Sequence, residues 1–353
     1  MTTNLVDQPV GHVADPADRE RPTVAQFLRA FARVGGLMAT VALVMVVFAA
    51  ASDGLFLYPD NLLGLLRYMS TIAIIGLGLT VVLVVGEIDL SFANLYGLSA
   101  MSMAVAWINW GWPLWVAILV ALAVAVLVGA FNAFFTSVVG IPSFIATLGS
   151  STLIFGFTLL FSGAQRFAPA APPPGRTMDA GEVEFFRGLS NQSLPFGVPM
   201  QVLWMIVIAL LFWLLLSRSL FGFRLKAIGG NPVAARFARL PVRRYKFWAF
   251  CIAGLSAAVA ALLDFSFIGS IQPDAGQALL FPTFAAVVIG GASLQGGRGS
   301  VAGTLLGALL LAVIANGLAL LAAGSFAQQM FLGVVTIGAV VLDQLTRNWR
   351  RDR

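Results

Sequence analysis

The sequence predicts an all-α polytopic membrane protein with about ten transmembrane helices. Of its 353 residues, 59% are hydrophobic and 10% are charged, whereas about 25% of the residues of a soluble globular domain are charged. Apolar segments of about 20 residues, long enough to cross a hydrocarbon core roughly 30 Å thick, follow one another along the chain. The alternation of apolar and polar residues that is typical of an outer-membrane β-barrel is absent from the sequence.

Ten apolar segments are each predicted to form one membrane helix. A polar tail at residues 1–34 precedes the transmembrane domain, which takes up residues 35–345, and a basic tail follows at 346–353. The eighth segment is short and ends in Gly290 and Gly291, which predicts a tilted or broken helix. In order, the segments are residues 35–52, 62–85, 91–109, 114–138, 144–162, 201–217, 247–268, 282–295, 301–321 and 328–342.

The distribution of Lys and Arg predicts that both termini are cytoplasmic. Residues 218–246, between the sixth and seventh segments, carry eight Lys or Arg and no acidic residue. With the N-terminus inside the cell, seventeen Lys and Arg lie on the cytoplasmic side and four lie on the other side. Short loops rich in Lys and Arg are retained in the cytoplasm, so this bias favours that orientation.

Two stretches resemble one another and predict an inverted internal repeat. Residues 127–149 and residues 313–333 share a pattern of Asn, Gly, Ser-Phe and Leu-Gly. In the predicted topology the first stretch enters the membrane from outside and the second enters from inside. Inverted repeats of this kind are common in transporters.

Composition and motifs exclude several classes of function. The net charge of +6 does not indicate nucleic-acid binding, because the basic residues lie at segment ends rather than on one soluble face. Cys251 lies in an apolar run and His12 in the polar tail, so we expect no metal site. Neither Lys226 nor Lys246 belongs to a Gly-Lys-Ser/Thr phosphate loop. We therefore expect a chain that is not an enzyme and has no ATPase site of its own.

The basic loop contains a more specific pattern than a topology signal requires. Residues 227–236 read Ala-Ile-Gly-Gly-Asn-Pro-Val-Ala-Ala-Arg. This pattern predicts a turn of small residues that runs into a short helix.

Three glycines in the ninth segment recur every four residues: Gly299, Gly303 and Gly307. This spacing builds a groove in which another helix backbone can approach closely. We expect a packing role for them rather than ligand contact.

Three acidic residues lie in or beside the apolar segments. Carboxylates near a membrane boundary are costly unless they are solvated or paired. For Glu87 and Asp89 we favour a structural role, in which Asp89 caps the helix that starts near Ser91, over contact with a solute or a gate. Asp264 lies inside the seventh segment and is a candidate functional acid by default; the alternative is that Ser266 and the nearby outer end of the segment leave it simply hydrated.

Uncharged polar side chains within the segments are suited to a path for a neutral, hydroxyl-rich solute. They offer hydrogen bonds without a fixed charge that would trap ions. Each could equally join two helices, a contribution of under about 1 kcal/mol. The residues are Asn94, Asn132, Thr147, Asn316 and Gln328.

Three stretches together resemble the membrane permease subunits of ribose/xylose/galactose-type ABC importers, a branch of the binding-protein-dependent transport family. They are residues 86–91, Gly-Glu-Ile-Asp-Leu-Ser; residues 227–236; and residues 285–299, from Ala-Ala-Val-Val-Ile-Gly-Gly to Gly-Gly-Arg-Gly. The resemblance covers about residues 40–345. It implies a multi-pass subunit of the bacterial inner membrane that imports a monosaccharide or a related polyol by alternating access.

The resemblance also implies partners. Two ABC ATPase subunits would bind ATP and Mg²⁺, which this chain does not bind itself. The other implied partners are a second permease copy or paralogue, an extracytoplasmic solute-binding protein and membrane lipid. No nucleic-acid partner is implied. The element that contacts the ATPase would be the loop formed by Gly229, Gly230, Asn231, Ala234, Ala235 and Arg236.

Two other functions stay open. A secondary transporter driven by an ion gradient would use Asp264 and Glu87 as proton or sodium sites. An integral-membrane enzyme acting on lipid-linked sugars would need clustered acids or basic phosphate clamps at one membrane face, and the sequence shows neither outside the basic loop.

Overall fold

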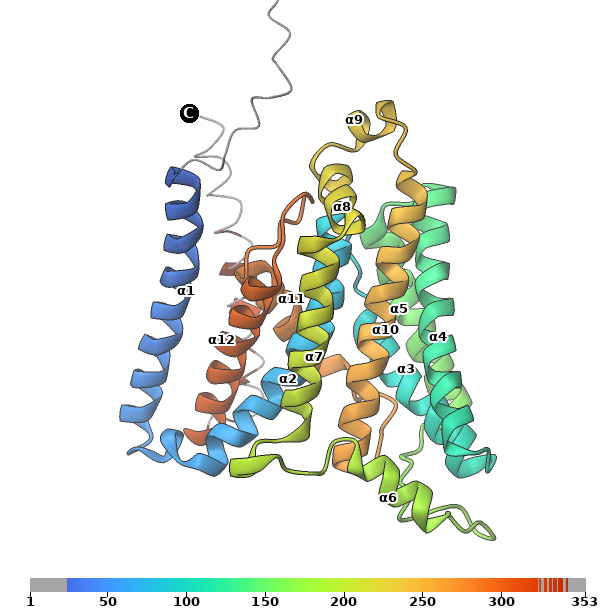
Figure 1. Cartoon of the computed structure of the whole chain (residues 1–353). Helices are drawn as coiled ribbons and strands as arrows, with labels where there is room; N and C mark the ends of the chain where they lie inside the picture. The colour runs from blue at the N-terminus through green and yellow to red at the C-terminus, as the bar shows by residue number, and fades with distance from the viewer. Residues whose placement is uncertain are drawn as a thin grey trace, which may run out of the picture.

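The computed structural model is a bundle of long helices that run side by side (Figure 1). It describes residues 24–322 and, beyond them, residues 324, 327, 328, 330, 331, 333, 334, 336–338 and 341, with side chains from residue 35 on. The α-helices are α1 (Val24–Ala51), α2 (Pro59–Val84), α3 (Phe92–Ala104), α4 (Leu114–Phe134), α5 (Ser143–Ser162), α6 (Ala180–Gly188), α7 (Met200–Trp213), α8 (Leu220–Gly230), α9 (Pro232–Phe237), α10 (Val242–Ile268), α11 (Leu280–Ile289) and α12 (Val301–Leu320).

Six helices in the described part of the chain are long and apolar enough to cross a membrane. α3, α4 and α7 each continue into one wider π turn, at Val105–Asn109, Phe135–Val139 and Leu214–Arg218. The apolar stretches Gly35–Ala51 and Gln277–Ile289 are shorter. The predicted all-helical membrane protein is thus confirmed, whereas ten spans and two cytoplasmic termini stay predictions. The six spans are Pro59–Val84, Leu114–Val139, Ser143–Ser162, Met200–Arg218, Val242–Ile268 and Val301–Leu320.

Two predicted boundaries need correction. The first helix begins at Val24, inside the predicted polar tail, because residues 24–34 contain no helix breaker, while its apolar part, Gly35–Ala51, agrees with the predicted segment. The short eighth segment is α11, ten residues that end before Gly290. Residues 1–23 of the predicted N-terminal tail, the C-terminal tail and six of the fifteen residues of the tenth segment lie outside the described residues.

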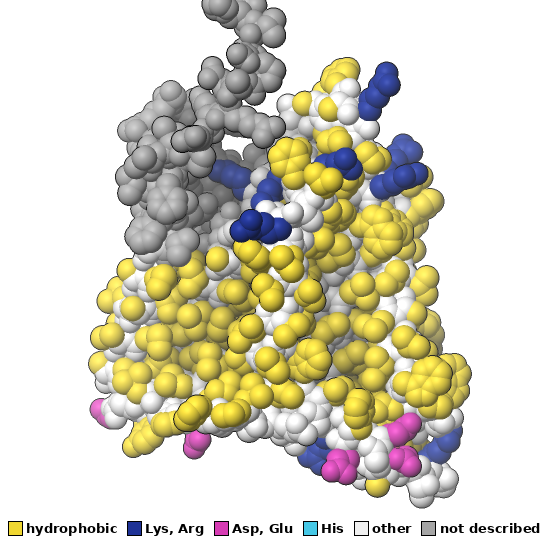
Figure 2. Space-filling model, viewed as in Figure 1, with side chains coloured by type: hydrophobic (Ala, Val, Ile, Leu, Met, Phe, Trp, Pro, Cys, Tyr) yellow, Lys and Arg dark blue, Asp and Glu magenta, His cyan; other side chains and the backbone are white. Residues whose placement is uncertain are grey.

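α2 and α10 form the centre of the bundle. The span in α2 is 89% buried, whereas those in α4, α5 and α7 are each 28% buried. The outer helices present large apolar side chains, such as Leu127 at 67% and Leu160 at 82% exposure. Figure 2 shows apolar side chains as a continuous band across the middle of the visible face, as expected for contact with lipid tails.

The two ends of the bundle differ in charge. We call the end that carries α8 and α9 the α9 face, and the end that carries α6 the α6 face (Figure 1). Lys and Arg side chains gather at the α9 face, while the acidic side chains in view lie at the α6 face (Figure 2). The α9 face contains the basic loop and is therefore the face predicted to be cytoplasmic.

Two of the three recurring glycines, Gly303 and Gly307, lie in α12 and pack against α11 as predicted, whereas Gly299 precedes α12 and faces the Val84 side chain of α2. A Cβ atom on Gly303 would lie 2.0 Å from the carbonyl oxygen of Gly290, and one on Gly307 would lie 1.9 Å from that of Ala286. The two backbones are therefore in direct contact, which only glycine permits at these positions.

Candidate functional site

The small-residue stretch of the basic loop forms a sharp bend between α8 and α9. α8 ends at Gly230, and the extended residue Asn231 caps the next helix by accepting a hydrogen bond from the backbone N–H of Ala234 at 3.0 Å. Pro232 occupies the first helical position, where its missing N–H costs nothing. The predicted short helix is thus confirmed as α9 at the tip of the α9 face, whereas the predicted turn at residues 227–230 is the helical end of α8 (Figure 1).

A glycine junction lies beneath this bend. A Cβ atom on Gly229 would lie 1.9 Å from the carbonyl oxygen of Val84, the last residue of α2, and 2.6 Å from the nitrogen of Gly297. That nitrogen donates a hydrogen bond to the same Val84 oxygen at 2.9 Å. On Gly296, a Cβ atom would lie 2.8 Å from the Cα of Gly86. Three chain segments therefore meet backbone to backbone directly below α9.

The three stretches that carried the family resemblance meet at this junction. Gly86 belongs to the first stretch, Gly229 to the second, and Gly296 with Gly297 to the third. They are separated by more than 60 residues along the chain. The sequence gives no direct sign that they are neighbours.

α9 is anchored on one side and exposed on the other. Ala235 is buried at 5% exposure, whereas Gly230, Asn231, Ala234 and Arg236 are exposed. Two apolar side chains that the sequence analysis did not single out are also exposed on α9, Val233 at 60% and Phe237 at 85%. The sequence alone could not have identified them, because the basic loop contains other apolar residues, such as Leu220 and Phe223. α9 thus presents a small apolar and basic surface of the kind that a partner protein can bind.

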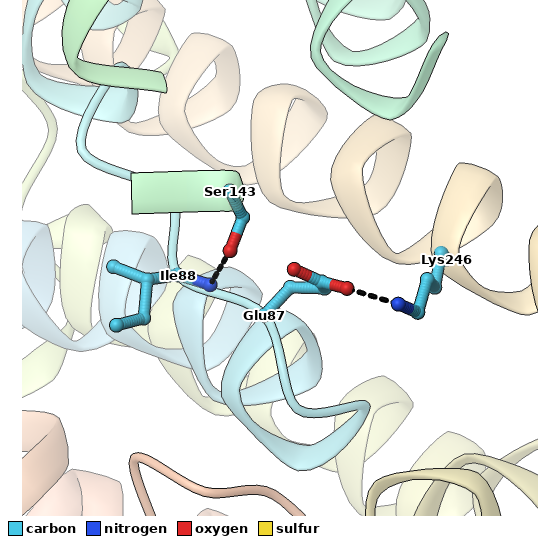
Figure 3. A network of polar contacts seen from close by, with 4 residues as sticks. All are labelled: Glu87, Ile88, Ser143 and Lys246. Atoms are coloured by element: carbon cyan, nitrogen blue, oxygen red, sulfur yellow. Dashed lines mark hydrogen bonds and ion pairs between the residues drawn. The ribbon is translucent and has the colours of Figure 1, made fainter. Parts of the chain in front are cut away.

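Glu87, one of the three candidate acids, forms a buried ion pair with Lys246 of α10 (Figure 3). Their side chains are 8% and 18% exposed. The next residue along, Ile88, donates its backbone N–H to the Ser143 hydroxyl at the start of α5, at 3.0 Å. The segment after α2 is thereby tied to α5 and to the helix that follows α9.

Asp89 lies just before α3 and binds Ser91, which is itself the N-cap residue of that helix. Its carboxylate accepts hydrogen bonds from the backbone N–H and the hydroxyl of Ser91, at 2.8 and 2.6 Å. Asn132 of α4 donates to the same hydroxyl at 2.7 Å. The described chain between α2 and α3 is not helical, so its backbone groups lack the hydrogen bonds of a helix. Side chains such as Asp89 supply hydrogen bonds that lipid tails could not.

Two further residues of the predicted solute path form hydrogen bonds at or beside this non-helical segment. The hydroxyl of Thr147 accepts a hydrogen bond from the backbone N–H of Leu90 at 3.1 Å. Asn94 donates to the hydroxyl and the carbonyl oxygen of Ser151 at 2.9 and 3.1 Å. Asn94, Asn132 and Thr147 therefore come together around one segment: Asn94 joins α3 to α5, while Asn132 and Thr147 bind the non-helical segment itself.

The other two path residues lie elsewhere. Asn316 of α12 exchanges two hydrogen bonds with Asn61 of α2, at 2.8 and 2.9 Å. Gln328 belongs to the partly described C-terminal region, where it is half-buried. The five residues thus do not form one cluster, and their role in a solute path stays a prediction.

Asp264 accepts hydrogen bonds from three other helices. The donors are the Thr71 hydroxyl of α2 at 2.9 Å, the Tyr96 hydroxyl of α3 at 2.7 Å and the Gln201 amide of α7 at 3.2 Å. Ser266, the nearby hydroxyl considered from the sequence, donates instead to the carbonyl oxygen of Phe186 in α6. Asp264 is therefore held by side chains of the bundle and joins four helices at one point.

Fold and site together define a polytopic helical membrane protein whose sequence motifs converge beneath one exposed short helix. Residues 61–340 match the family described as the permease component of branched-chain amino acid transport systems. The chain belongs to this family of transport permeases.

Similar proteins include sugar importer permeases. The autoinducer 2 import system permease protein of Klebsiella pneumoniae is 36% identical over 282 residues, covering 79% of this chain and 82% of the relative. The ribose import permease protein of Bacillus subtilis is 34% identical and covers 85% and 90%. The xylose transport system permease protein of Escherichia coli is 30% identical and covers 88% and 91%. The resemblance found from the sequence, to permeases of ribose/xylose-type ABC importers, is thereby confirmed.

Proposed function

We propose that this chain is the transmembrane subunit of an ATP-driven importer, and that it moves a monosaccharide or a related polyol across the bacterial inner membrane by alternating access. The observation that carries the proposal is the convergence of the three family motifs beneath the exposed helix α9. Ribose and xylose, named for two relatives, support a monosaccharide as the solute. The chain would act with a second permease copy or paralogue.

The geometry supports a coupling role for α9. ATPase subunits that bind ATP and Mg²⁺ would contact its exposed side, and their closure would displace it. Because the Gly229 backbone contacts the end of α2, and because α10 begins five residues after α9 ends, a displacement would reach both central helices. Small rigid-body shifts of packed helices are an established way to convert local closure into a change of access.

The opposite face would receive the solute-binding protein. The loop before α7 presents Phe196, whose side chain is 99% exposed on a turn with a φ of 64°. α6 adds Phe185 at 62% exposure. Exposed aromatic side chains are enriched where proteins bind one another, and these two lie on the face predicted to be external.

Partner identification with bulky variants of α9 tests this function. Gly230 has no atom within 4 Å of the position of a Cβ, and Ala234 is exposed, so Gly230→Trp and Ala234→Trp should preserve the fold while obstructing a partner. We expect a P-loop ATPase to co-purify with the native chain and to be lost from both variants. Ala180→Trp on α6, also at an exposed alanine, is the size-matched control and should retain it.

The same preparation distinguishes the ion-driven alternative. A chain that purifies alone, and that transports in ATP-free vesicles under a proton or sodium gradient, would contradict the importer function and favour Asp264 and Glu87 as ion sites.

A further inference from the structure

A cleft of about 780 Å³ opens at the α9 face beside the start of α10. One wall is the π turn that ends α4, with Thr136 and Ser137. The other wall carries four cations: Arg236 of α9 and Arg243, Arg244 and Lys246 of α10. Only Lys246 has an acidic partner among the described residues, Glu87. The cleft is therefore strongly positive.

The N-terminus of α10 adds to this positive charge. Its first turn has no acidic residue, and its N-cap, Pro241, provides no side-chain hydrogen bond. The first N–H groups of a helix carry a partial positive charge and bind anions, phosphate in particular. Pro241 lines the cleft, so this helix end lies at the site.

Two hydroxyl groups of the opposite wall lack partners. The side-chain oxygens of Thr136 and Ser137 are buried and form no hydrogen bond with any residue that the structure describes. Thr136 is 8% exposed. A buried hydroxyl without a partner is costly, and a bound group with acceptor oxygens would satisfy both.

The surroundings of the cleft are apolar and exposed. Val138, which lines it, and Val139 are each 53% exposed, and Trp248, one helical turn past Arg244, is 54% exposed. Tryptophan is enriched at the level of lipid headgroups. The cleft thus borders the apolar band that faces lipid tails, which is not expected of a surface that faces only a cytoplasmic protein.

We propose that this cleft binds the phosphate headgroup of an anionic phospholipid, with the acyl chains lying along the exposed side chains of α4 and α10. Basic pockets between membrane helices at the cytoplasmic level are suited to such headgroups. The hydroxyls of Thr136 and Ser137 donate to the phosphate oxygens, and the arginines supply the charge. The site does not depend on the proposed transport function.

Native mass spectrometry of the delipidated full chain tests the site. The chain is titrated with phosphatidylglycerol or phosphatidylcholine. We expect phosphatidylglycerol to bind with an affinity about tenfold or more above that of phosphatidylcholine, and Arg243→Gln/Arg244→Gln to remove this preference. Arg218→Gln/Arg239→Gln changes the net charge equally at the same face but outside the cleft, and should preserve the preference.

Thr136→Val tests the hydroxyl contact without a change of charge. Since the native hydroxyl has no partner in the described chain, the variant should be at least as heat-stable as the native protein, yet bind phosphatidylglycerol several-fold more weakly. Equal loss of the preference in both arginine double variants would mean general surface attraction and would overturn the proposal.

Two further outcomes decide the nature of the ligand. Displacement of phosphatidylglycerol by millimolar inorganic phosphate would show a site for a free anion rather than for a lipid. Loss of ATPase co-purification in Arg243→Gln/Arg244→Gln, with lipid binding unchanged, would assign the cleft to the ATPase subunit. Either result would contradict a lipid site.

Discussion

Single residues at the glycine junction distinguish packing from partner contact. Gly229 and Gly230 are adjacent and both end α8, yet only Gly229 is buried against other segments. In a helix, alanine is favoured over glycine by about 1 kcal/mol. Overpacking a well-filled site costs about 1–3 kcal/mol. The Val84 backbone oxygen would lie 1.9 Å from a Cβ atom on Gly229, and it cannot rotate aside as a side chain could.

We therefore predict that Gly229→Ala is destabilising and Gly230→Ala is not. Thermal unfolding in detergent should show a melting temperature several degrees lower for Gly229→Ala, because the added methyl group separates α8 from the end of α2. Gly230→Ala is the matched control and should melt at or slightly above the native temperature. Equal melting temperatures would contradict the close contact at Gly229.

The ion pair of Glu87 and Lys246 leads to a second prediction for single residues, on the stability of the protein. Removing one partner of a buried pair leaves an uncompensated charge and costs about 3–5 kcal/mol, whereas removing both is often nearly neutral. Glu87→Gln or Lys246→Met alone should therefore destabilise the protein more than the double variant does. We expect losses at the low end of that range, because the Lys246 side chain keeps 18% exposure. A double-mutant cycle of unfolding free energies measures the coupling; additive losses would contradict it.

At the scale of elements, α9 depends on its cap. It has six residues, too few for a helix to be stable in isolation. Loss of an N-cap side chain costs about 1 kcal/mol. We predict that Asn231→Ala frays α9 and that Asn231→Asp, which keeps the acceptor oxygen, does not. Hydrogen exchange at the backbone N–H of Ala234, the group bonded to Asn231, should be faster only in the alanine variant.

The same element shows what the sequence could and could not reveal. Asn231 followed by Pro232 is a local signal for a capped helix start, so α9 could be predicted from its own residues. The partners of Asn94, Asn132 and Thr147 lie 41 to 59 residues away along the chain. Polarity alone does not tell which neighbouring helix such a side chain faces. The sequence therefore identified these residues as notable without revealing the non-helical segment that they hold.

At the scale of the whole molecule, helix positions were largely predictable and helix packing was not. Continuous apolar runs locate α4, α5 and α12 within a few residues, because burial in lipid requires them. The cluster at Asp264 needs four helices in one relative arrangement, which no single segment encodes. For the same reason the meeting of the three motifs became visible only in the structure.

Orientation is the remaining prediction for the molecule as a whole. Cys251 is buried, so after Cys251→Ala a single cysteine can be placed at the exposed position 234 of α9 or 180 of α6. In spheroplasts, a maleimide that cannot cross the membrane should label position 180 directly and position 234 only after permeabilisation. The reverse pattern would contradict a cytoplasmic α9.

The most direct test of α9 as the coupling helix is site-specific photocrosslinking in native cells. A photoreactive phenylalanine analogue replaces Val233, the exposed apolar residue of α9, or Phe185, its counterpart on α6. We expect a crosslink from position 233 to a P-loop ATPase, altered in yield when ATP is depleted, and none to that protein from position 185. A chain that continues to transport while position 233 forms no crosslink to an ATPase would contradict this expectation.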